Sequence, residues 1–293
     1  MHHFISIVVP FHNNRNEIQL CCESLLNQAY PSDRYEIIFV DNNSRDNSSA
    51  IVSAFPSIIL LQQPVPGSYA ARNLGVRAAK GQIIAFTDAD CVAASDWLQQ
   101  INAAMQSSDV SLILGAYSGR RAKFPASALS AYENAKNRYI FLGQDQSLYY
   151  GYTNNMAVRP SVFDQFGFFV EVARGGDVML VRKVLDHDPD AKASIQYVGS
   201  MFVDHLEFNR VLSYYKKVFV HSRSVGRLRG QSLMRPLTNS QRHRAFRDML
   251  IVEQYSPLQA KLIYLIMAIG MLFWIAGWIF PLHQRPGTPE RGQ

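Results

Sequence analysis

Apolar and polar segments alternate in a regular order over the first hundred residues. Short apolar runs rich in β-branched residues, which predict strands, lie at residues 4–9, 36–40, 58–61 and 82–87. Segments with apolar residues at helical spacing lie between them, at residues 16–27, 46–55 and 69–79. This alternation predicts right-handed βαβ units, and hence an α/β fold with a mostly parallel sheet flanked by helices.

The pattern becomes less regular further along the chain. It still predicts helices at residues 97–105 and 126–142, and strands at residues 112–117 and 155–158. A glycine-led turn at Gly175 opens a further predicted helix that reaches Leu185.

One late segment, residues 262–282, carries no charged residue. Its length of about 20 residues suffices to cross a hydrocarbon core of ~30 Å, and Tyr264, Trp274 and Trp278 suit the membrane interface. The segment has no polar stripe, which favours a transmembrane helix over the alternatives, a buried core helix or a dimer helix. Residues 283–293, rich in proline and glycine, are predicted to form a disordered tail.

A basic stretch precedes the apolar segment. Residues 233–261 contain Arg242, Arg244, Arg247 and Lys261, and we interpret them as a juxtamembrane linker. Fewer basic residues follow the segment, so the charge bias predicts a single-pass protein of the inner or plasma membrane with its N-terminal region in the cytoplasm. The first residues predict a short strand and lack the pattern of a signal peptide, which agrees with that placement.

The composition excludes few classes of partner or site. The chain has 293 residues and a formal net charge of +6, which suits nucleic acid, anionic lipid or a phosphate-bearing substrate equally. Its three cysteines, Cys21, Cys22 and Cys91, show no CxxC or Cys/His spacing. A disulfide framework and a zinc site are therefore not expected, which fits a reducing compartment.

The sharpest chemical signal is Asp88-Ala89-Asp90, directly after the apolar run at residues 82–87. Ligands of parallel sheets bind beyond the carboxyl ends of the strands, and alternate residues of a strand share one face. The two carboxylates can therefore present oxygens to Mg²⁺ or Mn²⁺, which completes its shell with substrate phosphates and water. The alternative for an isolated Asp-x-Asp is a solvated turn.

Other strand ends carry polar residues too. Asp41 suits an acceptor for a base or ribose group, although Asp41 and Asp46 are also good turn formers. Arg72 opens a predicted helix after Gly67 and suits phosphate recognition, with a surface arginine as the alternative.

Several motifs follow one another in a set order along the chain. They are Val-Val-Pro-x-x-Asn at 8–13, Ser-Leu-x-x-Gln at 24–28, Glu-Ile-Ile-x-Val-Asp at 36–41, Ala-Arg-Asn-x-Gly at 71–75, Ala-x-Gly-Gln-Ile-Ile-Ala-Phe-x-Asp-Ala-Asp at 79–90 and Gly-Gly-Asp at 175–177. Together they resemble the family 2 glycosyltransferases. The resemblance implies the GT-A fold and a catalytic domain at residues 1–232, with a nucleotide-binding half at 1–110 and an acceptor half at 111–232.

The resemblance also implies roles for individual residues. Those expected to line the nucleotide-sugar pocket are Pro10, Asn13, Asp41, Arg72 and Asp88. Asp90 would be the principal metal ligand, with Asp88 as a second ligand and His205 as a further metal or phosphate contact. Asp177 would be the general base, although it could instead be a helix N-cap after two glycines. His12 and His205 could equally be structural residues held by hydrogen bonds.

These roles imply an inverting reaction. A cation that bridges the diphosphate stabilises the charge that develops as the anomeric C–O bond breaks. A carboxylate takes the proton of the attacking hydroxyl, and direct displacement inverts the anomeric centre. The predicted function is metal-assisted transfer of a sugar from a nucleotide-sugar donor to a glycan or lipid-linked acceptor at the membrane, with no nucleic-acid partner.

The chain departs from the family pattern at three places. Phe11-His12-Asn13 stands where family members commonly have Tyr-Asn, and Gly176-Asp177 stands where many have Glu-Asp. The Gln-x-x-Arg-Trp of processive synthases has its nearest match in Gln241-Arg242-His243-Arg244-Ala245, which lacks the tryptophan. This favours a single-addition transferase over a polymer synthase.

Two other functions stay open. A nucleotidyltransferase or an oxidoreductase on a similar sheet needs a glycine-rich phosphate loop, and no Gly-x-Gly-x-x-Gly follows the first predicted strand. A catalytically inactive membrane adaptor would not need Asp88, Asp90 and Asp177.

Overall fold

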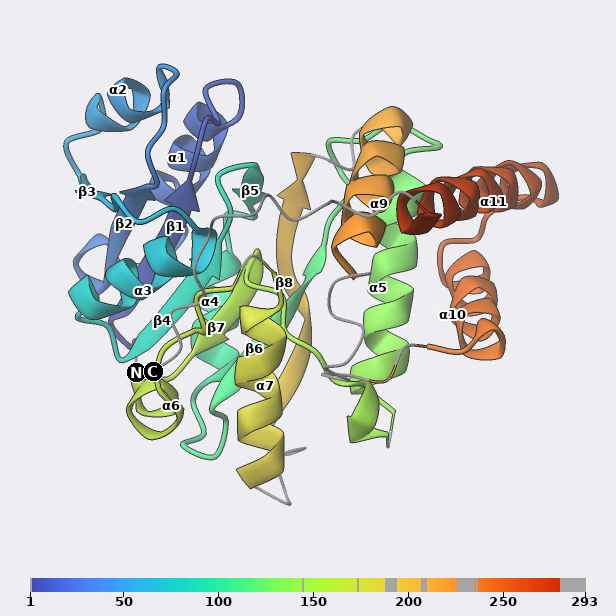
Figure 1. The fold of residues 1–293 in the computed structure, drawn as a ribbon. Helices are drawn as coiled ribbons and strands as arrows, with labels where there is room; N and C mark the ends of the chain where they lie inside the picture. The colour runs from blue at the N-terminus through green and yellow to red at the C-terminus, as the bar shows by residue number, and fades with distance from the viewer. Residues whose placement is uncertain are drawn as a thin grey trace.

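The computed structural model describes residues 2–143, 145–172, 174–187, 194–206, 210–225, 235 and 237–279. An eight-stranded sheet runs through the molecule in the order β3-β2-β1-β4-β7-β6-β8-β5. Helices cover both of its faces (Figure 1). The α/β architecture predicted from the sequence is confirmed.

The elements have the following bounds. The strands are β1 Ile5–Phe11, β2 Tyr35–Asp41, β3 Ile58–Gln62, β4 Ile83–Thr87, β5 Cys91–Ala93, β6 Leu112–Tyr117, β7 Asn155–Val158 and β8 Ile195–His205. The helices are α1 Ile18–Leu26, α2 Ser48–Ser53, α3 Ser68–Ala78, α4 Trp97–Ala104, α5 Ser127–Phe141, α6 Pro160–Phe166, α7 Gly176–His187, α9 Val211–Val225, α10 Asn239–Val252 and α11 Pro257–Ile279.

The first half of the sheet is parallel. β1 pairs with β2 and β4, and β2 pairs with β3, all in parallel register. β1 is buried along its whole length because its two faces serve two cores: Ile7 and Val9 pack in one hydrophobic cluster and Val8 in another. A strand covered on both sides has no polar face, which explains the continuous apolar run in the sequence.

β1 continues two residues beyond its predicted end, through Pro10 to Phe11. The sequence analysis ended the strand before Pro10 because proline lacks the N–H that a sheet ladder needs. β4, however, pairs with β1 only as far as Val8, whereas β2 follows β1 to its end. Proline is therefore tolerated at a position where one side of the strand has no partner.

The second half of the sheet is mixed. β7 lies antiparallel between β4 and β6, β8 is parallel to β6, and the edge strand β5 is antiparallel to β8. The pairing of β6 with β8 shifts register between Gly115 and Ala116. Asn155 bridges the two strands there, because its Nδ2 donates to Ala116 O at 2.8 Å and to Met201 O at 2.9 Å.

Helices α5, α9, α10 and α11 gather on the side of the molecule opposite α1, α2 and α3 (Figure 1). α10 lies within the segment interpreted as a linker and begins with a capping box between Thr238 and Gln241. α11 begins at Pro257, ahead of the predicted start at residue 262. Residues 280–282 of the predicted span and the whole tail at 283–293 lie outside the described residues.

α11 packs along one narrow face against the rest of the domain. The Tyr215 and Phe273 rings stack with centroids 5.0 Å apart, and Ser222 Oγ donates to Trp274 O at 2.5 Å. Most of its other apolar side chains are exposed, including Leu258 at 78%. α11 is long and apolar enough to cross a bilayer, which by itself is weak evidence of a membrane anchor.

Candidate active site

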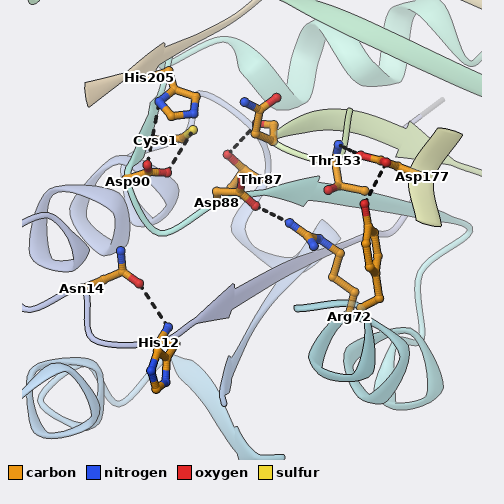
Figure 2. Close-up of polar contacts among 12 residues, drawn as sticks. His12, Asn14, Arg72, Thr87, Asp88, Asp90, Cys91, Thr153, Asp177 and His205 are labelled. Carbon is orange, nitrogen blue, oxygen red and sulfur yellow. Dashed lines mark hydrogen bonds and ion pairs between the residues drawn. The ribbon is translucent and has the colours of Figure 1, made fainter. Parts of the chain in front are cut away.

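The turn between β4 and β5 carries the Asp-x-Asp pair. β4 ends at Thr87 and β5 begins at Cys91, whose N–H donates to Asp88 O at 2.9 Å and closes the turn. Arg72 Nη2 donates to Asp88 Oδ1 at 2.5 Å, and the Arg72 side chain is only 6% exposed. Arg72 and Asp88 are thus in direct contact at the carboxyl end of β4 (Figure 2).

Asp90 lies beside His205 because of the way the edge strand pairs. In the antiparallel register of β5 and β8, Cys91 is opposite His205, and His205 Nδ1 lies 3.8 Å from Asp90 Oδ2. The ligand atoms of Asp90, Cys91 and His205 lie within 4.8 Å of one another. Among the residues that the structure describes, this group could hold a metal ion (Figure 2).

The chemistry of this group fits a hard divalent cation. Carboxylate oxygens suit Mg²⁺ and Mn²⁺, and a neutral imidazole is a common metal ligand. Burial raises the pKa of the Cys91 thiol well above its ordinary value, so Cys91 remains protonated and is a poor ligand. Burial also raises the pKa of Asp90, while the charge of Lys217 lowers it. A bound cation would hold Asp90 in its charged form.

Asp177 lies in the first turn of α7 and points into the same site. Its Oδ1 accepts a hydrogen bond from the Tyr69 hydroxyl at 2.7 Å and from Val178 N at 2.9 Å, and its Oδ2 accepts one from Thr153 N at 3.3 Å. Burial raises the pKa of Asp177, and the Tyr69 hydrogen bond and the Arg72 charge lower it. α7 begins at Gly176, so Asp177 is within the helix and is not its N-cap.

Two side chains of α3 join these groups. Arg72, which contacts Asp88, lies with its guanidinium carbon 5.3 Å from the Tyr69 ring centroid, and Tyr69 contacts Asp177. The charge of Arg72 lowers the pKa of both Asp90 and Asp177. The Asp88 and Asp90 pair and the distant Asp177 therefore lie around Arg72 (Figure 2).

Arg72 is also placed to receive a ligand. Within the described part of the chain, its Nε is buried and has no hydrogen-bond partner. A buried donor of this kind is normally satisfied, so a ligand that enters the site can supply the missing acceptor.

The residues of the β1 and β2 ends brace one another. Asp41 Oδ1 accepts from Ser44 N at 2.8 Å, and Asn13 Oδ1 accepts from Arg45 N at 2.8 Å. Asn13 has a left-handed backbone with a φ of 57°, which asparagine tolerates. Asp41 thus makes the contact expected of a turn former, which was its alternative role in the sequence analysis. Pro10 is buried within β1.

The two histidines have different surroundings. His12 lies with Nδ1 2.8 Å from Asn42 O and Nε2 2.9 Å from Asn13 Nδ2, so hydrogen bonds hold it in place. His205, in contrast, faces Asp90.

Asp46 behaves as a turn former. It accepts hydrogen bonds from Ser48 N at 3.0 Å and from Arg15 N at 3.1 Å.

The sequence analysis missed Tyr69, Thr153 and Lys217. Tyr69 directly follows Ser68 at the start of α3, and only its position three residues before Arg72, on the same helix face, could have indicated a shared site. Thr153 acts through its backbone, and Lys217 lies on a helix that was not predicted. These contacts depend on tertiary packing.

Known proteins of one family resemble this chain. The sequence profile of glycosyl transferase family 2 matches residues 6–167. Glycosyltransferase AglE of Haloferax volcanii is 29% identical over 191 residues, which cover 62% of each chain. Glycosyltransferase GlyG of Streptococcus pneumoniae is 33% identical over 122 residues, which cover 40% of each chain. The matched part thus spans less than two thirds of the length of these relatives.

Solved structures share the fold. The mannosyltransferase PcManGT from Pyrobaculum calidifontis, in complex with GDP-Man and Mn²⁺, is 14% identical with a TM-score of 0.63, over 95% of this chain and 87% of that one. S. aureus TarS 1-349, in complex with UDP-GlcNAc, is 16% identical with a TM-score of 0.54, over 94% of this chain and 89% of that one. At these identities the likeness concerns the fold alone.

The fold is the GT-A fold, and the family match defines the class as that of the glycosyltransferases. Because the family profile matches more than half of the residues, the assignment is specific: the chain belongs to glycosyl transferase family 2.

Proposed function

We propose that this enzyme is an inverting, divalent-cation-assisted glycosyltransferase that acts on a glycan or lipid-linked acceptor at a membrane. The observation that carries the proposal is the convergence of Asp88, Asp90 and Asp177 around Arg72 and Tyr69. The binding site for the nucleotide-sugar donor, the cation site and the general base would then form one active site.

Asp90 and His205 would hold Mg²⁺ or Mn²⁺, whereas Asp88, predicted as a second ligand, is paired with Arg72. When bound, the cation supplies positive charge to the diphosphate of the leaving nucleotide. Arg72 would bind the diphosphate with its guanidinium, whose Nε still lacks an acceptor within the described residues. Pro10, Asn13 and Asp41 would line the nucleotide end of the pocket. PcManGT holds GDP-Man and Mn²⁺ together, which supports the same pairing here.

Asp177 would accept the proton of the attacking hydroxyl. Its carboxylate is desolvated, and burial raises its pKa above that of an ordinary aspartate, which strengthens it as a base. Tyr69 and Thr153 fix the carboxylate by hydrogen bonds. With the base on the acceptor and the cation on the leaving group, a single displacement suffices, and the anomeric centre inverts.

The acceptor would approach beside β5. A cavity of about 300 Å³ lies there, between that strand and Ser118, Arg120, Arg121 and Asp204. Two arginines suit a phosphate, so the cavity favours a phosphate-bearing acceptor such as a lipid-linked sugar.

The membrane would be reached through α11. Its exposed side chains are apolar over most of its length, and Leu262, Leu265 and Leu272 are each at least 40% exposed. We propose a single-pass attachment to the inner or plasma membrane, with the catalytic domain in the cytoplasm, as the basic residues before the helix favour.

Donor hydrolysis tests the proposed function. The purified full-length chain is incubated with Mn²⁺ and a panel of nucleotide sugars, and release of nucleoside diphosphate is followed. Slow, metal-dependent release from one donor is expected. No turnover and no metal-dependent nucleotide binding would favour the inactive adaptor, and release of pyrophosphate from a nucleoside triphosphate and a sugar phosphate would favour a nucleotidyltransferase.

A further inference from the structure

α9 carries two adjacent lysines in different surroundings. Lys216 is exposed, whereas Lys217 is partly buried and its Nζ lies 3.3 Å from His205 Nε2. The charge of Lys217 is also felt at Asp90, the predicted metal ligand. One lysine of the pair thus belongs to the candidate active site, although its helix begins after the last strand of the sheet.

The packing of α9 fixes the position of Lys217. On the opposite side of the helix, the Tyr215 hydroxyl donates to Ile266 O of α11 at 3.2 Å. Further along, a Cβ at Gly277 would lie 2.4 Å from Phe219 O, so the two helices are in close contact there. α9 is therefore held between α11 and the site. Its packing against α11 fixes the position of Lys217.

The contact of Lys217 with His205 depends on the state of the imidazole. An ammonium is only a donor, so His205 Nε2 must be the acceptor, and any ring proton is then on Nδ1. Nδ1 is the atom that faces Asp90. The ammonium stands at the end of a flexible four-carbon stem. It can therefore turn from His205 Nε2 towards an anion that enters beside Asp90.

We propose that Lys217 binds the donor diphosphate and stabilises it as the leaving group. The ammonium would exchange its imidazole acceptor for a diphosphate oxygen, while Asp90 and His205 would hold the cation. Lys217 and Arg72 then supply two protein cations to the leaving group from two different helices. The proposal rests on the proposed function, since it requires a nucleotide diphosphate at the Asp90 site.

Equilibrium binding separates this role from a structural one. We would measure the affinity of the full-length chain for UDP and GDP in Mn²⁺, with UMP and GMP as references, in Lys217→Met and in the matched control Lys216→Met. Charge-assisted hydrogen bonds predict diphosphate binding about tenfold weaker in Lys217→Met. Monophosphate binding should change much less, and Lys216→Met should behave as the wild type.

The affinity for Mn²⁺ alone should move in the opposite direction. Removal of a positive charge beside Asp90 and His205 lowers the repulsion of a cation, so Lys217→Met should bind Mn²⁺ as tightly as the wild type or more tightly. A lysine that only supports the shape of the site would weaken both affinities when it is removed. Lys217→Arg keeps the charge and should retain most of the diphosphate affinity, and Lys217→Gln serves if the methionine variant is poorly folded.

Equal diphosphate affinity in the Lys217 and Lys216 variants would overturn the proposal, as would a parallel loss of Mn²⁺ binding. If the wild-type chain binds Mn²⁺ but neither nucleoside diphosphate, the proposed function fails with it. If the wild-type chain binds a nucleoside diphosphate in Mn²⁺ and Lys217→Met binds it equally well, the role of Lys217 is overturned and the proposed function stands.

Discussion

The two halves of the sheet contribute to the site in different ways. In the parallel half, Asp41 and Asn13 are held by backbone N–H groups of the neighbouring loop, and these contacts stay within the first half of the chain. In the mixed half, Asp90 meets His205 only because β5 pairs with β8 in one register. The first half is largely self-contained, whereas the second depends on long-range pairing.

This difference between the two halves separates the residues proposed to bind the nucleotide from those proposed to bind the metal and to accept the proton. The groups proposed for the nucleotide lie on a βαβ scaffold, at the carboxyl ends of parallel strands where such folds bind ligands. The proposed metal ligands and base come from the turn before the edge strand β5, from the end of β8, a long strand with a register shift, and from the first turn of α7. Changes in the second half should therefore impair metal binding and transfer, and changes to its packing should also lower stability.

The largest effect is expected from Asp90→Asn. An amide is a far poorer ligand for a hard cation, so Mn²⁺-dependent nucleotide binding should weaken by about a hundredfold or more. Calorimetric titration of UDP and GDP with and without Mn²⁺ measures this, with the exposed Asp109→Asn as the matched carboxylate control. Retained affinity and metal dependence in Asp90→Asn would remove this residue from the metal site.

Asp177→Asn should separate binding from transfer. General-base catalysis predicts a loss of about 10²–10⁴ in kcat, with nucleoside diphosphate affinity close to the wild-type value. The exposed Asp186→Asn on the same helix should have normal kcat. A loss of less than about tenfold in Asp177→Asn would contradict the assignment of the base.

Gly115→Ala should destabilise the mixed half of the sheet. A Cβ there would lie 2.4 Å from Met201 O and 2.3 Å from Asn155 Nδ2 at the register shift of β6 and β8. Overpacking of this kind costs about 1–3 kcal/mol, measurable as the free energy of unfolding in urea. Gly199→Ala in β8 is the control and should be nearly neutral, because a Cβ there would meet, among the described residues, only Tyr197 Cε1 at 3.8 Å. Equal stability of the two variants would refute close packing at the shift.

Tyr69→Phe should have the smallest effect and changes only the pH dependence. The Tyr69 hydroxyl stabilises the Asp177 carboxylate and lowers its pKa, against the larger rise caused by burial. Without it the pKa rises further, so the carboxylate is lost at a higher pH as the solution is acidified. The acid limb of the kcat/KM profile should move up by about one pH unit. An unmoved limb would show that Asp177 does not control it.

The sequence predicted the fold better than the contacts within the site. The strands β2, β4, β6 and β7 and the helices α3 and α5 were predicted from apolar runs and helical spacing, whereas the helices α9 and α10 were not predicted. β8 was missed, since Gly199 and Ser200 interrupt its apolar pattern. The contact between Tyr69 and Asp177, 108 residues apart, has no local signal. The Asp-x-Asp pair could be found because a strand end places both carboxylates together.

The most direct measurement is a titration of Mn²⁺ into the wild-type chain, followed by electron paramagnetic resonance, with and without UDP or GDP. If the carboxylates and the diphosphate share one ion, one of the nucleotides should tighten Mn²⁺ binding by about tenfold or more, and Mn²⁺ should tighten that nucleotide equally. Mn²⁺ binding that is indifferent to both nucleotides would contradict the shared site.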